Sequence, residues 1–496
     1  MTADVVVVGT GPNGLSAAVT MARAGLSVEL YEAAPEIGGG LRTKALFRDD
    51  VVHDICSAVH PMAATSRFFR EFDLRARGVE LLQPEISYAH PLADGRAALA
   101  HHNLDAACAG LGRDGRAWRA LMEPLLAHSQ GLVDFALGGQ RSLPEDLRAP
   151  LLLARGILRH GTPLARRAFA GEEAAALLAG VAAHVVGRMP TPSSAGVALL
   201  LGHLAHGTGW PVPRGGSMRI AEAMVADVTA HGGTITTGQR ISDLRELRGA
   251  RAVLLDVGPK EFLAIGGPLL PRAYRASLQS FRYGPGAAKV DFLTSGPIPW
   301  ANAQVGRAGT VHLGGRQQDV FRQESLVARG RRGDEPFVLV VDPAAADPGR
   351  VGSGGHRPVW AYAHVPHGDP TDPADLVTAR IERYAPGFAD TVVERRSMSA
   401  TDLERYNPNY VGGDIAAGAM TLKQTVLRPV PRWDPYRTPL RGVYLCSAST
   451  PPGPGVHGMS GYLAAKSALR REFGIRTAPA LAPESVPSGI TGAGRH

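Results

Sequence analysis

The stretch "ADVVVVGTGPNGLSAAVTMARAGLSVELYE", residues 3–32, decides the fold of this chain. Its four consecutive valines, Val5 to Val8, predict a strand that is buried on both faces, which is typical of a parallel sheet. A glycine-rich turn follows, and the apolar spacing after it predicts a helix over 12–24. Residues 27–31 predict a second strand. This order of strand, turn, helix and strand indicates a Rossmann-like α/β domain.

The turn has the spacing G-x-G-x-x-G. Its glycines suit a tight turn, a close approach of backbone to phosphate, and close packing of helix on strand. The helix N-terminus offers N–H groups and partial positive charge to a pyrophosphate. An acid lies 18 residues after the last glycine, where a carboxylate can accept both hydrogens of a ribose diol. The predicted dinucleotide-binding residues are Gly9, Gly11, Pro12, Asn13, Gly14 and Glu32.

A second glycine cluster, "EIGGGLRT" at 36–43, comes directly after this acid. With it the sequence resembles the superfamily of FAD-dependent amine oxidases and phytoene desaturases, in which the chain turns back here to meet the phosphates and ribitol. The resemblance implies FAD contacts from Gly38, Gly39, Gly40, Arg42 and Thr43. The common form of the motif is G-G-R-x-x-[ST]. This chain has Gly40 at the Arg position, and Arg42 stands two residues further on.

The far end, "RGVYLCSASTPPGPGVHGMSGYLAAKSALRREFG" at 441–474, predicts a strand over 443–446, a loop, and a helix from about Gly458. It resembles the C-terminal flavin motif of the phytoene desaturase group. The helix N-terminus would stabilise the anion of reduced flavin. Many members carry an acid after the strand, and here Ser447 and Ala448 replace it. The resemblance implies flavin contacts from Ser447, Ala448, Val456, His457, Gly458 and Met459.

A third segment, 210–244, predicts a turn, a helix and a strand. In the family this strand ends on a residue whose backbone meets adenine, and by position that residue is Ile241. Another strand is expected within 251–259. The motifs look closest to a bacterial branch that resembles the pyridine nucleotide-disulphide oxidoreductase domain-containing type 2 proteins. That branch lacks a C-x-x-C redox pair, as this chain does.

The resemblance implies a discontinuous organisation. The fold class is α/β: a Rossmann-like FAD-binding domain of the glutathione reductase-like GR2 type, with an inserted α+β substrate domain that has a mixed sheet and a helical lid. The predicted FAD-binding domain comprises 1–75, 205–290 and 400–474. The predicted substrate-binding domain comprises 76–204 and 291–399, and 475–496 is expected to be a disordered tail because it is rich in Pro, Ser and Gly.

Composition excludes several other classes of protein. The chain of 496 residues has a net charge of +8, but its basic residues are spread along the sequence, so no nucleic-acid partner is expected. Three cysteines give neither a disulfide framework nor a zinc spacing, and no metal site is expected. We expect no signal peptide and no membrane-spanning helix, a cytoplasmic location, and a monomer or homodimer.

Residues 102–205 are expected to be mostly helical. The segment 151–169 is basic and amphipathic, although Gly161 and Pro163 interrupt it. Relatives that act on carotenoids dock on membranes through a helical region at this place. Two interpretations therefore remain: a peripheral membrane contact, or a helical lid packed on its own core.

The candidate catalytic residues are His457, Lys289, His60 and Tyr406. His457 lies in the loop that enters the flavin-facing helix, where an imidazole could stabilise reduced flavin or only cap the loop. Lys289 begins a strand after a Gly-Pro-Gly turn, at the position where amine oxidase relatives have a Lys near flavin N5. His53 and His60 flank Cys56 and could line the pocket. Asn409 and Tyr410 are further pocket candidates.

The predicted function is FAD-dependent oxidation of an organic substrate, with hydride transfer from a C–H bond to flavin N5 and formation of C=C or C=N. FAD is expected to be non-covalent, and a link through Cys56 or a His is the alternative. The electron acceptor could be oxygen, a quinone or NAD(P). The rival functions are a flavin-dependent saturase or double-bond isomerase and, from another class, a non-catalytic escort of prenylated proteins.

Overall fold

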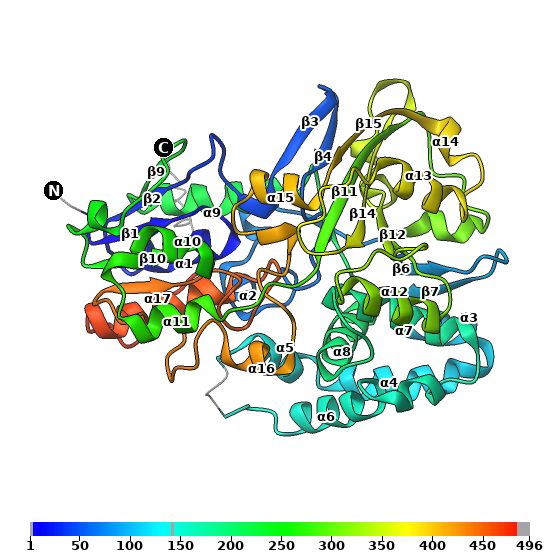
Figure 1. Cartoon of the computed structure of the whole chain (residues 1–496), viewed down its shortest axis with the longest axis horizontal. Helices are drawn as coiled ribbons and strands as arrows, with labels where there is room; N and C mark the ends of the chain where they lie inside the picture. The colour runs from blue at the N-terminus through cyan, green and yellow to red at the C-terminus, as the bar shows by residue number, and fades with distance from the viewer. Residues whose placement is uncertain (1–2, 140–142, 484–496) are drawn as a thin grey trace, which may run out of the picture.

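The computed structural model describes residues 3–139 and 143–483, and these form two lobes (Figure 1). The first lobe contains a parallel five-stranded sheet in the order β16-β10-β1-β2-β9. Its strands are β1 (Val5–Val8), β2 (Val28–Tyr31), β9 (Thr234–Thr236), β10 (Ala252–Leu255) and β16 (Val443–Leu445). All four residues of β1 are buried, as the valine run predicts for a central strand.

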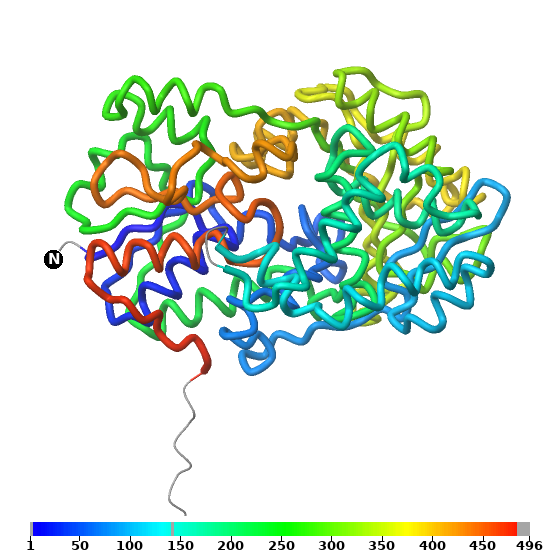
Figure 2. The backbone as a smooth tube through the Cα atoms, turned by 90° about the horizontal axis from the view of Figure 1, so that it is seen from below, coloured from blue at the N-terminus to red at the C-terminus, as the bar shows by residue number. Residues whose placement is uncertain are grey.

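The two ends of the chain meet in this lobe. Helix α1 (Pro12–Arg23) packs against α17 (Met459–Glu472), and Figure 2 shows the red C-terminal helix beside the blue N-terminal segment. Ser16 Oγ donates a hydrogen bond of 2.6 Å to the carbonyl of Gly458. A Cβ on Gly461 would lie 1.8 Å from the carbonyl oxygen of Asn13, so only glycine permits this helix contact.

The second lobe is built on a seven-stranded mixed sheet in the order β15-β11-β14-β13-β12-β6-β7. Its strands are β6 (Ile86–Pro91), β7 (Ala97–His101), β11 (Gly286–Thr294), β12 (Ala308–Leu313), β13 (Val338–Val341), β14 (Arg357–Val365) and β15 (Val392–Met398). One face packs its apolar side chains in a core that includes α13 (Ala374–Glu382). The opposite face is covered by helices of residues 102–205, and it also lines a large cavity.

The segment 102–205 is mostly helical, as predicted. It contains α3 (Leu104–Gly110), α4 (Gly115–Ala127), α5 (Ser129–Leu137), α6 (Arg148–His160), α7 (Glu172–Ala182) and α8 (Pro192–His206). Helix α6 ends at the predicted interruption, and a short 3-10 helix, Pro163–Arg167, follows. Figure 1 shows α5, α6 and α16 along one edge of the molecule.

Smaller elements complete the two lobes. The helices are α2 (Arg67–Phe72), α9 (Met218–Ala230), α10 (Pro259–Gly266), α11 (Arg272–Gln279), α12 (Gln317–Val327), α14 (Phe388–Thr391), α15 (Ala400–Tyr406) and α16 (Leu422–Leu427). The strand pairs are β3 (Thr43–Arg48) with β4 (Val51–Asp54), and β5 (Leu81–Leu82) with β8 (Val212–Pro213). Within the described residues, no helix is long and apolar enough to cross a bilayer.

The predicted α/β fold class is confirmed, with corrections at two boundaries. Strand β11 runs across the predicted domain boundary at 290 and belongs entirely to the second sheet. The strand expected to end at Ile241 ends at Thr236. Residues 475–483 contain no helix or strand, and the rest of the predicted tail, 484–496, lies outside the described residues.

Candidate active site

The G-x-G-x-x-G turn is packed so closely that larger residues would collide. A Cβ on Gly14 would lie 2.1 Å from the carbonyl oxygen of Gly9, which has a φ of +96°. A Cβ on Gly39 would lie 2.9 Å from the Cα of Gly11, so the second glycine cluster packs directly on the first. The close approach forms a narrow backbone cradle at the start of α1.

The cradle has hydrogen-bonding capacity that the protein does not use. Gly11 is the N-cap of α1 and has no side chain to satisfy the N–H groups of the first turn. The buried Oδ1 of Asn13 has no hydrogen-bond partner among the described residues. The N-terminus of α1 is positively polarised, and its Gly14 N–H is bound by a carboxyl oxygen of Asp256. A helix N-terminus suits the pyrophosphate of a dinucleotide, so the residues present fit this group.

Glu32 lies at the end of β2 and is 8 % exposed. Its Oε2 accepts hydrogen bonds from the backbone N–H and hydroxyl of Thr10, at 3.0 and 2.6 Å. Its Oε1 accepts from the N–H of Ala34 and lies 3.4 Å from the Arg42 guanidinium. These contacts hold the carboxylate at the edge of the glycine cradle. Because a carboxylate has about four acceptor positions, it retains capacity for a ribose hydroxyl.

The Arg42 guanidinium is engaged by the protein itself. It donates to the carbonyls of Ile37 and Glu36, which fixes the second glycine turn. At position 40, where the family motif has Arg, this chain has glycine. A Cβ added to Gly40 would lie 2.7 Å from the hydroxyl of Tyr410, so a side chain has no room there. A tyrosine from the late part of the chain therefore fills the space beside this position. Phosphate binding by Arg42 stays a prediction.

The other residues of this turn connect it to neighbouring segments. The Thr43 hydroxyl donates to Asp54 at 2.7 Å and accepts from the N–H of Met218 at 3.1 Å. Gly38 has a φ of +101°, and its N–H donates to the carbonyl of Thr10. Ile241 is buried in the core beside β10, where its side chain is 5 % exposed. Adenine contact by Ile241 stays a prediction.

Asp256, which follows β10, is a site residue that the motif analysis missed. Its Oδ2 accepts a hydrogen bond of 2.9 Å from the N–H of Gly14, inside the glycine cradle. Burial raises the pKa of this carboxyl to about 7. Asn409 fixes the loop, because its Nδ2 donates to the Asp256 carbonyl and its Oδ1 accepts from the N–H of Gly258. The sequence contained one indication of this role: Asp256 lies at the end of the apolar run in the strand expected within 251–259.

His457 is a structural cap of the C-terminal loop. Its Nδ1 accepts from the N–H of Met459 at 3.0 Å, and its Nε2 lies 3.1 Å from the carbonyl of Gly453. Burial lowers the pKa of the ring to about 4, so it is neutral at pH 7. The ring does not line the main cavity, whereas the neighbouring Val456 and Met459 do. The capping alternative thus describes the contacts of this ring within the protein, and a role at the flavin or substrate stays a prediction.

The turn after β16 is held by a buried arginine. Arg428 donates to the carbonyls of Ala448 and Gly418. The carbonyl of Ser447 accepts from the Thr450 hydroxyl at 2.7 Å. The turn at 447–448, which lacks the usual acid, is therefore compact, and Arg428 fixes its backbone. Flavin contacts by Ser447, Ala448 and Gly458 stay predictions.

The other three catalytic candidates lie behind the cavity wall. Lys289 Nζ donates to both carboxylate oxygens of Asp291 at 2.6 Å and lies 5.8 Å from the centre of the Trp360 ring. His60 Nε2 lies 2.8 Å from the Ser217 hydroxyl in a fully packed network, and burial lowers its pKa to about 4. Tyr406 lies beside Arg42, with the guanidinium 5.5 Å from its ring centre. None of the three lines the main cavity.

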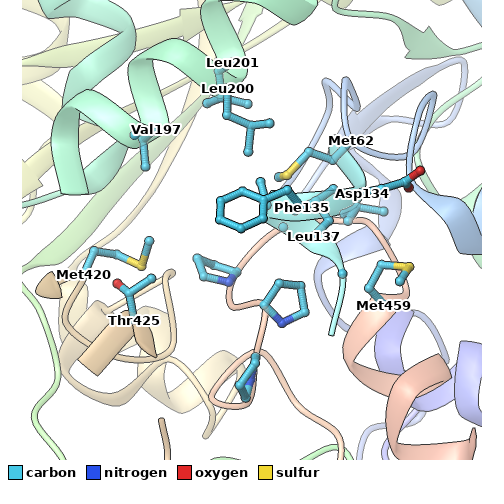
Figure 3. A pocket seen from close by; sticks show the side chains of 18 of the residues that line it. Met62, Asp134, Phe135, Leu137, Val197, Leu200, Leu201, Met420, Thr425 and Met459 are labelled. Carbon is cyan, nitrogen blue, oxygen red and sulfur yellow. The ribbon is translucent and has the colours of Figure 1, made fainter. Parts of the chain in front are cut away.

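The main cavity has a volume of about 1640 Å³ and lies between the two lobes. Its walls include Ser57 to Val59, which follow the second glycine cluster, and Gly455 and Val456, which lie in the loop before α17, so the cavity adjoins the loops that are predicted to bind the flavin. Figure 3 shows Phe135 of α5 between Met62, Leu200 of α8 and Met459 of α17. The floor is one face of the large sheet and includes Thr310, Leu339, Val341, Trp360 and Tyr362.

Comparisons with known proteins agree with this architecture. A family model described as an NAD(P)-binding Rossmann-like domain matches residues 7–72. The pyridine nucleotide-disulfide oxidoreductase domain-containing protein 2 of Rattus norvegicus is 26% identical over 555 residues, covering 94% of this chain and 93% of that protein. The protein of the same description from Mus musculus is also 26% identical, with the same coverage.

Solved structures share the fold at low identity. A putrescine oxidase is 17% identical with a TM-score of 0.57, covering 95% of this chain and 100% of that one. Cyclohexylamine oxidase from Brevibacterium oxydans is 16% identical with a TM-score of 0.55, covering 95% and 99%. These two structures share the fold of this chain. The glycine cradle and the matched Rossmann-like model agree with a dinucleotide-binding domain. Over nearly its whole length the chain resembles the type 2 proteins, as its motifs predicted.

Proposed function

We propose that this protein is an FAD-dependent dehydrogenase that introduces a C=C bond into a large apolar substrate, with hydride transfer from a substrate C–H to flavin N5. The observation that carries the proposal is the cavity of about 1640 Å³, which adjoins the cofactor loops and has mostly apolar walls. Bound FAD would supply the hydride acceptor. The chain's own residues bind the substrate beside it and exclude water, which protects the reaction from side products.

The charges around the cavity favour a neutral substrate over a charged amine. The carboxylates among its described lining residues are Asp134, Glu145, Asp146 and Asp434. Three of them are already paired: Asp134 with Arg70, Asp146 with His128 at 2.7 Å, and Asp434 with Arg471 at 3.7 Å. Glu145 is exposed. Asp291, which pairs with Trp360 in the strand register, is bound by Lys289 and is not among the described lining residues. None of the four lining carboxylates comes from the sheet floor, where an ammonium group would need one.

Non-covalent FAD is part of the proposal. Cys56 lines the cavity, but burial raises the pKa of its thiol, which disfavours the nucleophilic thiolate that a covalent link would require. Precipitation of the holoenzyme with acid should release the flavin into the supernatant. Yellow colour that stays with the denatured polypeptide would contradict this part.

The test of the reaction is anaerobic mixing of the holoenzyme with candidate polyenes, saturated lipids and amines. We expect the flavin absorbance to bleach with an apolar substrate and the product to lose two hydrogens. Product formation without bleaching would favour the isomerase. Bleaching only by amines would refute the C=C proposal, and purified protein that stays colourless after reconstitution with FAD would refute the class of reaction.

We also propose that the substrate enters from a membrane surface. Near the cavity mouth, Leu422, Val426 and Trp433 are 60%, 53% and 81% exposed, and all three line the cavity. On α6, Leu151 and Leu158 are 70% and 67% exposed. Exposed arginines accompany them, namely Arg155, Arg159, Arg166 and Arg167. An apolar surface with basic residues is typical of interfacial helices that bind anionic lipid.

Sedimentation with vesicles tests the membrane proposal. The holoenzyme should sediment with vesicles that contain phosphatidylglycerol, and less with vesicles of phosphatidylcholine alone. Leu151→Asp together with Leu158→Asp should abolish sedimentation and leave flavin content unchanged, because both side chains project from the protein. Equal sedimentation of the wild type and this variant would refute the proposal.

A further inference from the structure

The floor of the cavity has a polar edge at β12, far from β11. Alternate residues of each strand face the cavity, and the strand register aligns them in rows. Tyr362 of β14 pairs with Lys289 of β11 on one side and with Leu339 of β13 on the other. Leu339 in turn pairs with His312 of β12. His312 is therefore about 14 Å from Lys289, three strand spacings of ~4.8 Å away.

A cluster of polar side chains lies at this far end. His184, in the turn between α7 and α8, lines the cavity, and its Nε2 lies 2.9 Å from His312 Nε2. Thr310 lies two residues before His312 on the same face of β12 and also lines the cavity. Trp210 closes the wall, with its ring edge-on to His184 at 5.5 Å.

This cluster contains a hydrogen-bonding group without a partner. Thr310 is 1% exposed, and its Oγ1 has no hydrogen-bond partner among the described residues. Leaving a buried hydroxyl unpaired is costly, so a ligand group that reaches it gains affinity. In the His184–His312 pair one Nε2 donates and the other accepts, and Nδ1 of His184 is not used by this bond.

The cluster is electrically neutral. Burial lowers the pKa of His184 to about 3 and also lowers the pKa of His312 well below its ordinary range. The neighbouring carboxylate, Glu324, does not line the cavity, because it is bound by His364 at 2.7 Å and by the N–H of Gly187. A charged ligand group would therefore be buried here without a counter-charge, which is unfavourable.

We propose that the inner end of the cavity is a binding site for a neutral oxygen group, a hydroxyl or carbonyl, at one end of an otherwise apolar substrate. Thr310 Oγ1 and the His184 ring hydrogen-bond this oxygen. The His184–His312 pair can exchange donor and acceptor roles between its tautomers, so it serves either group. The site fixes how far the substrate enters, and thereby which carbon lies beside the flavin. This inference rests on the proposed function for its substrate class.

Binding of matched probes to the holoenzyme tests the site without turnover. The probes are dodecanol, dodecane and dodecylammonium, measured by displacement of a fluorescent apolar dye from the cavity. The wild type should bind dodecanol about tenfold more tightly than dodecane, as expected for one or two hydrogen bonds to buried groups. Thr310→Val should remove this preference and leave dodecane binding unchanged. Ser193→Ala, which removes a hydroxyl from another part of the cavity wall, is the matched control and should keep it.

A second variant and an independent readout keep the test decisive. His184→Leu should also remove the preference for dodecanol. Thr310→Val should not lower the midpoint of thermal unfolding, because the hydroxyl that it removes is unpaired. Equal binding of dodecanol and dodecane, tighter binding of dodecylammonium, or no binding of any probe would overturn the proposal. A failure of the proposed reaction would show instead as unbleached flavin, with the preference for dodecanol intact.

Discussion

Replacement of Asp256 by Asn should remove a pH-dependent loss of stability and of FAD affinity. Burial raises the pKa of this carboxyl from 3.8 to about 7. The folded protein therefore keeps a proton that the unfolded chain has already released above pH 4. The contribution of this carboxyl to folding is most favourable below its unfolded pKa, and stability falls as the pH rises through 7.

The magnitude follows from the size of this shift. A difference of about three pH units, at ~1.4 kcal/mol each, corresponds to a loss of up to about 4 kcal/mol above pH 8. Asp256→Asn keeps an oxygen that can accept from the N–H of Gly14 but cannot ionise. A bound pyrophosphate would add negative charge beside this carboxyl. FAD affinity of the wild type should therefore also decrease as the pH rises, and that of the variant should stay level.

Two measurements check this prediction between pH 5 and 9: urea unfolding of the apoprotein, and the dissociation constant for FAD from flavin fluorescence. At pH 5 the variant should already be the more stable by about 1–2 kcal/mol, and at pH 8 this difference should grow to about 4 kcal/mol. Asp375→Asn, which changes a side chain that is 92% exposed, is the control and should follow the wild type. Parallel pH profiles for the wild type and Asp256→Asn would refute the reasoning.

Three further predictions concern residues of the site. Gly14→Ala places a Cβ 2.1 Å from the Gly9 carbonyl, and the resulting overpacking of ~1–3 kcal/mol should reduce FAD affinity about ten- to a hundredfold. The flavin content of the purified protein measures this loss. Gly110→Ala, whose Cβ meets no atom within 4 Å, is the control and should leave the flavin content unchanged. His457→Ala should lower stability by about 1–3 kcal/mol because it removes the cap of α17, with partial recovery in His457→Asn and no change in the pH profile of kcat between 5 and 8; a lost ionisation in that profile would contradict the capping role. Lys289→Met leaves the Asp291 carboxylate buried and unpaired, so it should cost about 3–5 kcal/mol, and the double variant Lys289→Met/Asp291→Asn should recover most of that loss in urea unfolding; additive losses would show that the two side chains do not act as a pair.

The local patterns of the sequence were enough to predict the cofactor side of the molecule. Four valines, the glycine spacing and an acid at the right distance correctly predicted β1, α1 and β2, and the far end correctly predicted β16 and α17. These features are predictable because each depends on a few neighbouring residues: strand burial, backbone space at glycines, and helix periodicity. The resemblance then indicated that the two ends belong to one site, and the packing of α1 on α17 agrees with it.

The chemistry of individual side chains depended on tertiary contacts that no local pattern records. From the sequence, His457 in the loop before α17 could either face the flavin or cap the loop. The structure shows that its Nδ1 accepts from the N–H of Met459 at the start of the helix. Asp256 looked like an ordinary residue after a strand, and only the pairing of β10 with β1 brings its carboxyl to Gly14, 242 positions away. Gly40 departs from the family motif because Tyr410, from a distant segment, occupies the space beside it.

The sequence by itself thus determined the strand, turn and helix that form the glycine cradle, because these depend on the backbone of short, regular motifs. Only the tertiary structure decided what the substrate meets. The cavity walls come from α5, α8, α16, α17 and the large sheet, and the polar end at His184 and Thr310 exists because strand register and helix packing bring these two residues to one place. Side-chain neighbours of this kind are set by the packing of elements far apart in the chain, and the spacing of residues within one element carries no information about them.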